Sequence, residues 1–127
     1  MTENELSKIL VDIAYQIHVK LGPGLLESVY ENIYAYELKK RHLEFRQQIE
    51  VPIVYDGVRF DNSLRLDLLI EGQIIVELKS IEQILPVHKK QLLTYLKLSD
   101  KRLGLLINFN EVLIKNGITR IVNNLSE

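Results

Sequence analysis

A run of apolar residues near the C-terminus, GLLINF from Gly104 to Phe109, most constrains how this chain can fold. Such a nearly continuous run is typical of a strand that is covered on both faces. The pattern predicts a helix from Pro86 to about Leu98 before this run, and a strand from Ile74 to Lys79 before that helix. Because a helix joins the two strands, we expect them to be parallel neighbours connected by a right-handed crossover.

The N-terminal third of the chain predicts a pair of helices. Apolar residues recur at helical spacing up to about Leu21, and Thr2 with Glu5 has the form of a capping box. The segment Gly22-Pro23-Gly24 ends this helix, since glycine suits a left-handed cap and proline cannot continue the helix. A second helix is expected from about Leu25 to His42.

The remaining segments predict strands and tight turns. Alternating apolar residues indicate a strand from Phe45 to Tyr55, in which Pro52 favours an edge position or a bulge. Asp56-Gly57 is a strong hairpin turn, and a last hairpin over residues 112–122 is expected to turn at Asn116-Gly117. With 127 residues the chain fits one domain, residues 1–127. We expect an α/β (α+β) fold in which helices flank a central mixed β-sheet.

Two neighbouring strands, Leu64 to Ile70 and Ile74 to Lys79, limit the turn between them. The expected apolar face of the first strand consists of Leu64, Leu66, Leu68 and Ile70. A regular two-residue turn at Glu71-Gly72 would set the apolar row of one strand beside the polar row of the other. The hydrophobic pattern therefore predicts a three-residue loop or a bulge near Glu71 to Gln73.

With that loop, Asp67, Glu77 and Lys79 lie close together on one face of the sheet. Two carboxylates and an ammonium are costly to bury without partners. One interpretation is an ordinary solvated face on which Lys79 pairs with Glu77. The other is a covered site, because the second and third helices both need a surface to pack on and this face is available to them.

Polar side chains of the two helices add to the cluster in the second interpretation. One stripe of the second helix carries Glu27 and Tyr30 and continues with Glu31 and Tyr34. One stripe of the third helix carries His88, Gln91 and Tyr95. Each stripe alone is more often structural than functional. Together with the sheet residues, they would supply hard oxygen ligands for Mg²⁺, which keeps several waters, and a cation beside a phosphate.

The same residues resemble known signatures, in order along nearly the whole chain. Asp67 followed by Glu77-Leu78-Lys79 is similar to the D…(D/E)xK signature of the PD-(D/E)XK nuclease superfamily, although Leu66 stands where a proline is common. The segment from Gln91 to Tyr95 resembles the QxxxY motif of its helicase-associated exonuclease branch. The segment from Gly24 to Tyr30 matches the motif of the GxxExxY proteins, a small family in that superfamily.

The resemblance implies a restriction-endonuclease-like core and a set of metal ligands. Asp67 and Glu77 would bind a divalent metal, helped by the backbone carbonyl of Leu78. Glu27 would be a further ligand or would position a metal-bound water. Lys79 would orient or activate the attacking water and offset charge on the phosphate.

Supporting residues follow from the same resemblance. Gln91 and Tyr95 would steady the site or contact the nucleic-acid backbone, and Tyr30 and His88 are expected beside them. We therefore expect a nuclease that uses Mg²⁺ or Mn²⁺ and hydrolyses phosphodiester bonds, with DNA favoured over RNA. The alternative is a nuclease-like binding or assembly module that does not cleave productively on its own. An enzyme for a small phosphorylated molecule is a third class, without specific support in the sequence.

Composition limits the partners and the setting. The net charge of −1 gives no global positive field, so nucleic acid would have to meet local clusters at residues 39–41, 89–90 and 101–102. Ordinary solvated charge is the favoured interpretation of each cluster alone. No cysteine is present, and no apolar run approaches the roughly 18 residues of a membrane span. We expect a cytoplasmic protein without a membrane partner, and the apolar C-terminal hairpin suggests a homodimer.

Overall fold

The computed structural model describes residues 1–126, with the backbone alone for residues 62 and 63. The elements in chain order are α1 (Glu3–Leu21), α2 (Glu27–Lys40), β1 (Phe45–Tyr55), β2 (Val58–Ile70), β3 (Ile74–Lys79), α3 (Pro86–Ser99), β4 (Leu103–Asn108), a 3-10 helix (Ile114–Gly117) and β5 (Ile118–Val122). No helix in this part of the chain is both long and apolar enough to span a membrane.

Five strands form one mixed sheet in the order β1-β2-β3-β4-β5. β3 and β4 are parallel, and every other neighbouring pair is antiparallel. Helix α3 makes the crossover between the two parallel strands, and β4 is buried along its whole length. The predicted mixed sheet with a parallel β3–β4 pair is therefore confirmed.

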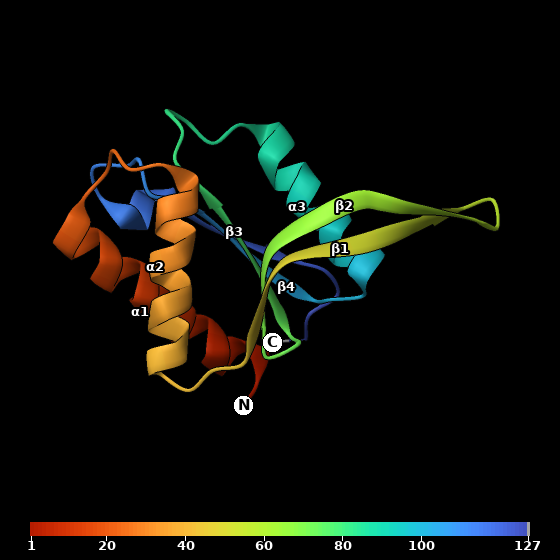
Figure 1. The fold of residues 1–127 in the computed structure, drawn as a ribbon, viewed down its shortest axis with the longest axis horizontal. Coiled ribbons are helices and arrows are strands. Elements are labelled where there is room, and N and C mark those ends of the chain that lie inside the picture. The colour runs from red at the N-terminus through yellow and green to blue at the C-terminus, as the bar shows by residue number, and fades with distance from the viewer. Residues whose placement is uncertain (127) are drawn as a thin grey trace.

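Helices cover both faces of the sheet, with α1 and α2 on one face and α3 on the other (Figure 1). The larger core joins the apolar faces of α1 and α2 to β2, β3 and β4. The smaller core places Leu92 and Leu96 of α3 against Ile75 of β3 and Leu106 of β4. The sheet is therefore the middle layer of three, as expected for strands that are apolar on both faces.

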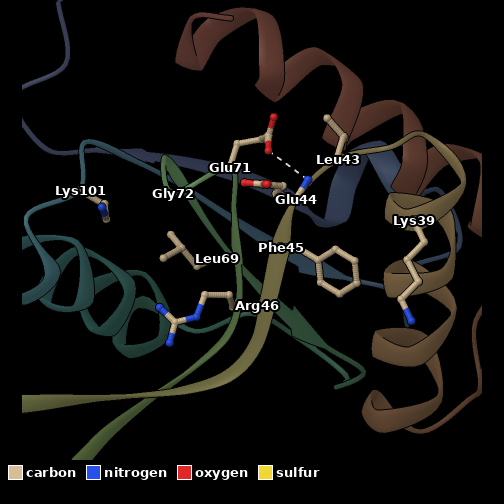
Figure 2. A pocket seen from close by; sticks show the side chains of 9 residues that line it. All are labelled: Lys39, Leu43, Glu44, Phe45, Arg46, Leu69, Glu71, Gly72 and Lys101. Atoms are coloured by element: carbon tan, nitrogen blue, oxygen red, sulfur yellow. Dashed lines mark hydrogen bonds between the residues drawn. The ribbon is translucent and has the colours of Figure 1, made fainter.

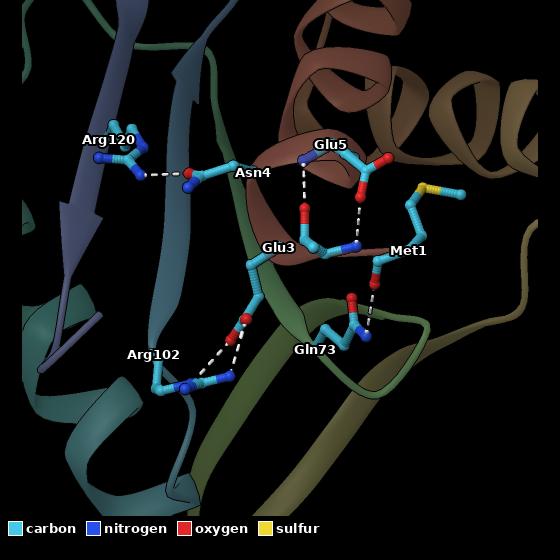
Figure 3. A network of polar contacts seen from close by, with 8 residues as sticks. Met1, Glu3, Asn4, Glu5, Gln73, Arg102 and Arg120 are labelled. Atoms are coloured by element: carbon cyan, nitrogen blue, oxygen red, sulfur yellow. Dashed lines mark hydrogen bonds and ion pairs between the residues drawn. The ribbon is translucent and has the colours of Figure 1, made fainter. Parts of the chain in front are cut away.

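The start of α1 is tied to the far strands of the sheet by polar contacts (Figure 3). The predicted capping box is present, since Thr2 and Glu5 exchange hydrogen bonds of 3.0 and 3.1 Å. The Glu3 carboxylate accepts two hydrogen bonds from Arg102, at 2.8 and 2.9 Å. Asn4 accepts one from Arg120 at 2.6 Å. These contacts fix the helical layer relative to β4 and β5.

The β1–β2 hairpin extends well beyond the rest of the sheet (Figure 1). It turns at Asp56-Gly57, whose φ angles of 55° and 75° suit the predicted tight turn. β1 is an edge strand, and its pairing register with β2 shifts between Val51 and Ile53. Both features expected from Pro52, an edge position and a bulge, are confirmed.

One prediction about this hairpin is wrong: Leu64, Leu66, Leu68 and Ile70 do not share a face. Leu64 and Leu66 pack in the core of α3, whereas Leu68 and Ile70 pack in the core of α1 and α2. The change of face in β2 lies opposite Gln48 of β1, whose φ of 50° is in the left-handed region. A residue in that conformation interrupts the regular alternation of a strand, so the hairpin changes face at this point.

The predicted turn at Asn116-Gly117 is also wrong. Both residues lie in the 3-10 helix, and the C-terminal antiparallel pair is formed by β5 with β4. Gly117 packs so closely on the backbone carbonyl of Asn108 that a Cβ atom would have no room. Glycine is therefore needed at position 117 because the backbone there lies close to β4, and not because it forms a hairpin turn.

Candidate functional site

The candidate site lies where β2 and β3 part. The two strands pair at Ile70–Ile74, Leu69–Ile75 and Leu68–Val76, so the loop between them has three residues, 71–73, as predicted. The next opposed residues are Asp67 and Glu77, and their side chains take the place of the ladder. The register prediction that brings these two carboxylates together is thus confirmed.

Each of the two carboxylates binds the backbone of the opposite strand. Glu77 Oε2 accepts a hydrogen bond from the N–H of Asp67 at 2.7 Å. Asp67 Oδ2 accepts one from the N–H of Leu78 at 2.9 Å. Backbone donors that lose a strand partner need another acceptor, and the carboxylates supply it. One oxygen of each carboxylate is therefore fixed by the backbone.

Burial leaves this pair of acids short of positive charge. Glu77 is only 7% exposed, and burial, followed by the negative charge of Asp67, raises its pKa to about 8. Burial also raises the pKa of Asp67. The Lys79 ammonium lowers the pKa of both acids, although it forms no ion pair with either among the described residues. The solvated face with a Lys79–Glu77 pair is therefore the wrong interpretation.

Helix α2 brings a third carboxylate, that of Glu27, toward Asp67. Glu27 is the first residue of α2 and is exposed, and its negative charge contributes to the raised pKa of Asp67. The preceding loop reaches this position through Gly22 and Gly24, whose φ angles are 67° and 109°. Those angles suit glycine and allow α2 to start beside the sheet.

Tyr30 holds that loop from inside the core. Its ring is fully buried and stacks on Phe109 with centroids 4.3 Å apart. Its hydroxyl donates to the carbonyl of Gly22 at 2.6 Å and accepts from the N–H of Leu25 at 3.3 Å. Tyr30 is therefore a supporting residue of the segment that carries Glu27, and its burial rules out direct contact with nucleic acid.

Helix α3 places Tyr95 beside the acids and His88 away from them. Burial raises the pKa of Tyr95, and the charges of Glu77 and Asp67 raise it further, whereas a hydrogen bond with the side chain of Gln91 lowers it. His88 Nδ1 accepts from the N–H of Leu85 at 2.8 Å and caps the first turn of α3. The predicted cluster is thus joined by Tyr95 and Gln91, while His88 has a structural contact.

Two glutamines that the sequence did not single out, Gln47 and Gln48, contact Glu31 of α2 near Asp67. The Glu31 carboxylate accepts hydrogen bonds from the side-chain amides of Gln47 at 3.0 Å and Gln48 at 2.7 Å. The Gln48 amide also lies 3.4 Å from Asp67 Oδ1. Burial raises the pKa of Glu31, and the charge of Asp67 adds to that effect. Helical spacing places Glu31 on the stripe of Glu27, whereas sequence pattern gives no signal for the two glutamines, because nothing in it predicts a left-handed conformation at Gln48.

Two further polar residues hold the segments around the site. Ser80 Oγ donates to the carbonyl of Leu25 at 2.6 Å and so ties the end of β3 to the loop before α2. Asn108 is fully buried and bonds both the N–H and the carbonyl of Ile81, at 3.1 and 2.9 Å. The sequence could have pointed to both residues, because Ser80 follows β3 and Asn108 ends β4. The carboxyl ends of parallel strands are where functional residues are commonly found.

A surface hollow of about 800 Å³ lies at the start of β1, and neither Asp67 nor Glu77 lines it (Figure 2). Lys39, Arg46 and Lys101 line it, and none of them forms an ion pair within the described part of the chain. Glu44 and Glu71 line its rim, where the Glu71 carboxylate accepts from the N–H of Glu44. The hollow therefore collects one lysine from each of two predicted basic clusters.

The other members of those clusters are neutralised locally. Lys40 pairs with Glu37 at 3.2 Å, and Arg41 pairs with Asp12 at 3.1 Å. Arg102 is bound by Glu3, as described above. Ordinary structural charge thus explains these three side chains, whereas Lys39 and Lys101 beside them form no ion pair within the described residues.

The donor atoms at the site suit a hard divalent cation. Among the described residues, no group of three or more acidic or histidine side chains is arranged to hold a metal. The buried Glu77 and the half-buried Asp67 nevertheless present two oxygen donors in a place with too little positive charge. Mg²⁺ is commonly held by one or two carboxylates and keeps several waters. The pair therefore fits Mg²⁺ or Mn²⁺.

Comparison with known proteins gives a family and a fold. A family model described as the PD-(D/E)XK nuclease superfamily matches residues 4–121. No curated protein matches the chain. The crystal structure of SSO0001 is similar, with a TM-score of 0.53 and 18% sequence identity over 95% of this chain and 79% of that chain. At this identity the likeness concerns the fold alone.

Proposed function

Because this chain belongs to the PD-(D/E)XK nuclease superfamily, we propose that it is a metal-dependent nuclease centred on Asp67 and Glu77. The observation that carries the proposal is the pair of carboxylates at the parting of β2 and β3, of which Glu77 is buried and Asp67 is half-buried. Each uses one oxygen to bind the opposite strand, which leaves the other oxygen for a ligand. A buried acid beside a half-buried one is costly without a positive partner, and a bound cation would relieve that cost.

The residues around the pair would have separate roles in metal binding and in catalysis. Asp67, Glu77 and the backbone carbonyl of Leu78 would hold Mg²⁺ or Mn²⁺, with Glu27 as a further oxygen donor. When bound there, the ion would supply positive charge that polarises a phosphoryl oxygen. Lys79 would orient the attacking water and offset the charge that develops on the phosphate.

The remaining motif residues would support this arrangement. Tyr95 and Gln91 would steady the acids from α3 or contact the nucleic-acid backbone. The segment from Gly24 to Tyr30 supports membership of the GxxExxY family, since it delivers Glu27 to the site. The proposed substrate is DNA in preference to RNA, and the protein would act in the cytoplasm.

Calorimetric titration with Mn²⁺ tests the metal site, and single-turnover assays on labelled single- and double-stranded DNA and RNA test the reaction. We expect saturable binding by the wild type, strong loss in Asp67→Asn and Glu77→Gln, and cleavage only with metal. Absence of saturable Mn²⁺ binding up to millimolar concentration would overturn the proposal. Binding without cleavage of any strand would favour the nuclease-like binding or assembly module instead.

A further inference from the structure

We propose that Glu31 and Gln48 form a pair that positions Asp67 for metal binding. The inference rests on the proposed function and extends it to two residues outside the family signatures. The three side chains come from α2, β1 and β2, and the amide of Gln48 stands between the two carboxylates. The pair thus links α2 to the point where the hairpin leaves the sheet.

Hydrogen-bond lengths show how the pair is organised. Gln48 Nε2 is 2.7 Å from Glu31 Oε1 but 3.4 Å from Asp67 Oδ1. The short contact to a carboxylate is the stronger one, so Glu31 anchors the amide. The longer contact then sets the rotation of the Asp67 carboxylate, whose other oxygen is fixed by the N–H of Leu78. Two donors together define where Asp67 Oδ1 faces.

The backbone of Gln48 is the second observation. Its φ of 50° lies in the left-handed region, which is unfavourable for a residue with a side chain. Glycine would adopt this conformation without that cost, yet the chain carries glutamine. Because strained residues cluster at functional sites, a retained side chain at such a position indicates a use for that side chain.

Neighbouring Gln47 shows what a merely structural glutamine does here. It lies on the same strand and its amide donates to the same Glu31 carboxylate, at 3.0 Å. Among the described residues, the Gln47 amide bonds Glu31 alone, whereas the Gln48 amide bonds both Glu31 and Asp67. The two glutamines therefore differ in the one contact on which the proposal depends, and Gln47 provides a matched control.

Gln48→Gly separates positioning from folding. Glycine relieves the left-handed strain and removes the amide, so the variant is expected to be at least as stable as the wild type. Loss of a residue that orients a metal ligand typically weakens metal binding by about 10–100-fold. We expect a loss of that size in calorimetric Mn²⁺ titration of Gln48→Gly, and a change of less than about threefold in Gln47→Ala. Gln48→Asn, which also tolerates positive φ but has a shorter reach, should lose affinity as well.

A double-mutant cycle tests the part assigned to Glu31. If Glu31 acts through the amide, Glu31→Gln should cost less Mn²⁺ affinity in the Gln48→Gly background than in the wild type. An equal loss in both backgrounds would show that Glu31 acts on the metal directly and would overturn the pairing.

The failure of this inference can be told from failure of the proposed function. If the wild type binds Mn²⁺ and Gln48→Gly binds it equally well, the positioning role is refuted while the metal site stands. If the wild type shows no saturable binding, both are refuted.

Discussion

The carboxylate of Glu77 accepts a hydrogen bond from the backbone N–H of Asp67, 2.7 Å away, just beyond Leu68 and Val76, the last residues at which β2 and β3 pair. The acid thus replaces the strand carbonyl that this N–H would otherwise meet. Truncation of Glu77 to alanine would leave a buried donor without an acceptor, which costs about 1–3 kcal/mol. Amide replacements keep an acceptor in place, so Asp67→Asn and Glu77→Gln are the informative variants for the metal site.

Stability of the metal-free protein should fall as the pH rises from about 5 to above 8. Glu77 has a folded-state pKa of about 8, against roughly 4.3 in an unfolded chain. Between these values the folded state holds a proton that the unfolded state has lost, so unfolding becomes easier with increasing pH. The loss of stability is absent below the pKa of Glu77 in the unfolded chain and is complete above its pKa of about 8 in the folded protein. Denaturant unfolding in the presence of a chelator, at pH 5, 6, 7, 8 and 9, measures it.

Glu77→Gln is the control for this pH dependence. The amide keeps the hydrogen bond from Asp67 but carries no titrating proton, so most of the decline should disappear. A wild-type decline that persists unchanged in Glu77→Gln would assign the effect to another group.

Tyr30→Phe should loosen the segment that carries Glu27. The change removes a hydroxyl that bonds the carbonyl of Gly22 and the N–H of Leu25, so a loss of about 1 kcal/mol in unfolding free energy is expected. Mn²⁺ affinity should fall severalfold, because Glu27 is then less firmly placed. Thermal unfolding and calorimetric titration measure the two effects.

Tyr34→Phe is a matched comparison for that variant. Tyr34 is also fully buried in α2, and its hydroxyl donates to the carbonyl of Leu10 at 2.7 Å. We expect a similar loss of stability without a change in Mn²⁺ affinity. Equal effects of both variants on metal binding would contradict the role given to Tyr30.

Much of this fold could be predicted because hydrophobic period and register depend on simple packing. The apolar run at β4 and the helix before it required a parallel pair, and the need to keep apolar rows together required an odd loop at residues 71–73. Both features are decided by which face of a strand is buried. The meeting of Asp67 with Glu77 follows from the same rule.

The unpredicted features depend on backbone conformations that side-chain pattern does not encode. The buried face of β2 changes between Leu66 and Leu68, opposite Gln48 of β1, which has a left-handed backbone conformation. Glutamine has no preference for that conformation, so the sequence does not predict the change. The glycine at position 117 fits a turn in the sequence pattern, but a close approach favours glycine equally, and Gly117 makes the close approach. The acids at the site were therefore predictable, whereas the amides that position them were not.

Charge reversal in the hollow at the start of β1 should weaken nucleic-acid binding. Arg46 and Lys101 line it without ion-pair partners in the described part of the chain. If each contacts a phosphate, Arg46→Glu and Lys101→Glu should weaken binding of a labelled DNA strand and reduce the slope of log K against log salt by about one each. Fluorescence anisotropy at several salt concentrations measures both. Lys115→Glu is the control, since Lys115 is exposed and lines a different hollow, and an equal loss there would indicate a general charge effect.

Replacement of Lys79 should impair turnover much more than metal binding. Its ammonium has no lone pair to offer a metal, and it lowers the pKa of both acids from a distance, without an ion pair among the described residues. Lys79→Ala should therefore keep Mn²⁺ affinity within a few-fold of the wild type. Removal of a preorganised positive group from the reacting phosphate costs about 3 kcal/mol in the barrier, or a rate loss of about a hundredfold or more. Single-turnover cleavage at saturating Mn²⁺, together with calorimetric titration of the same variant, separates the two effects. A variant that loses metal affinity in proportion to its rate would place Lys79 in the support of the carboxylates instead of beside the phosphate.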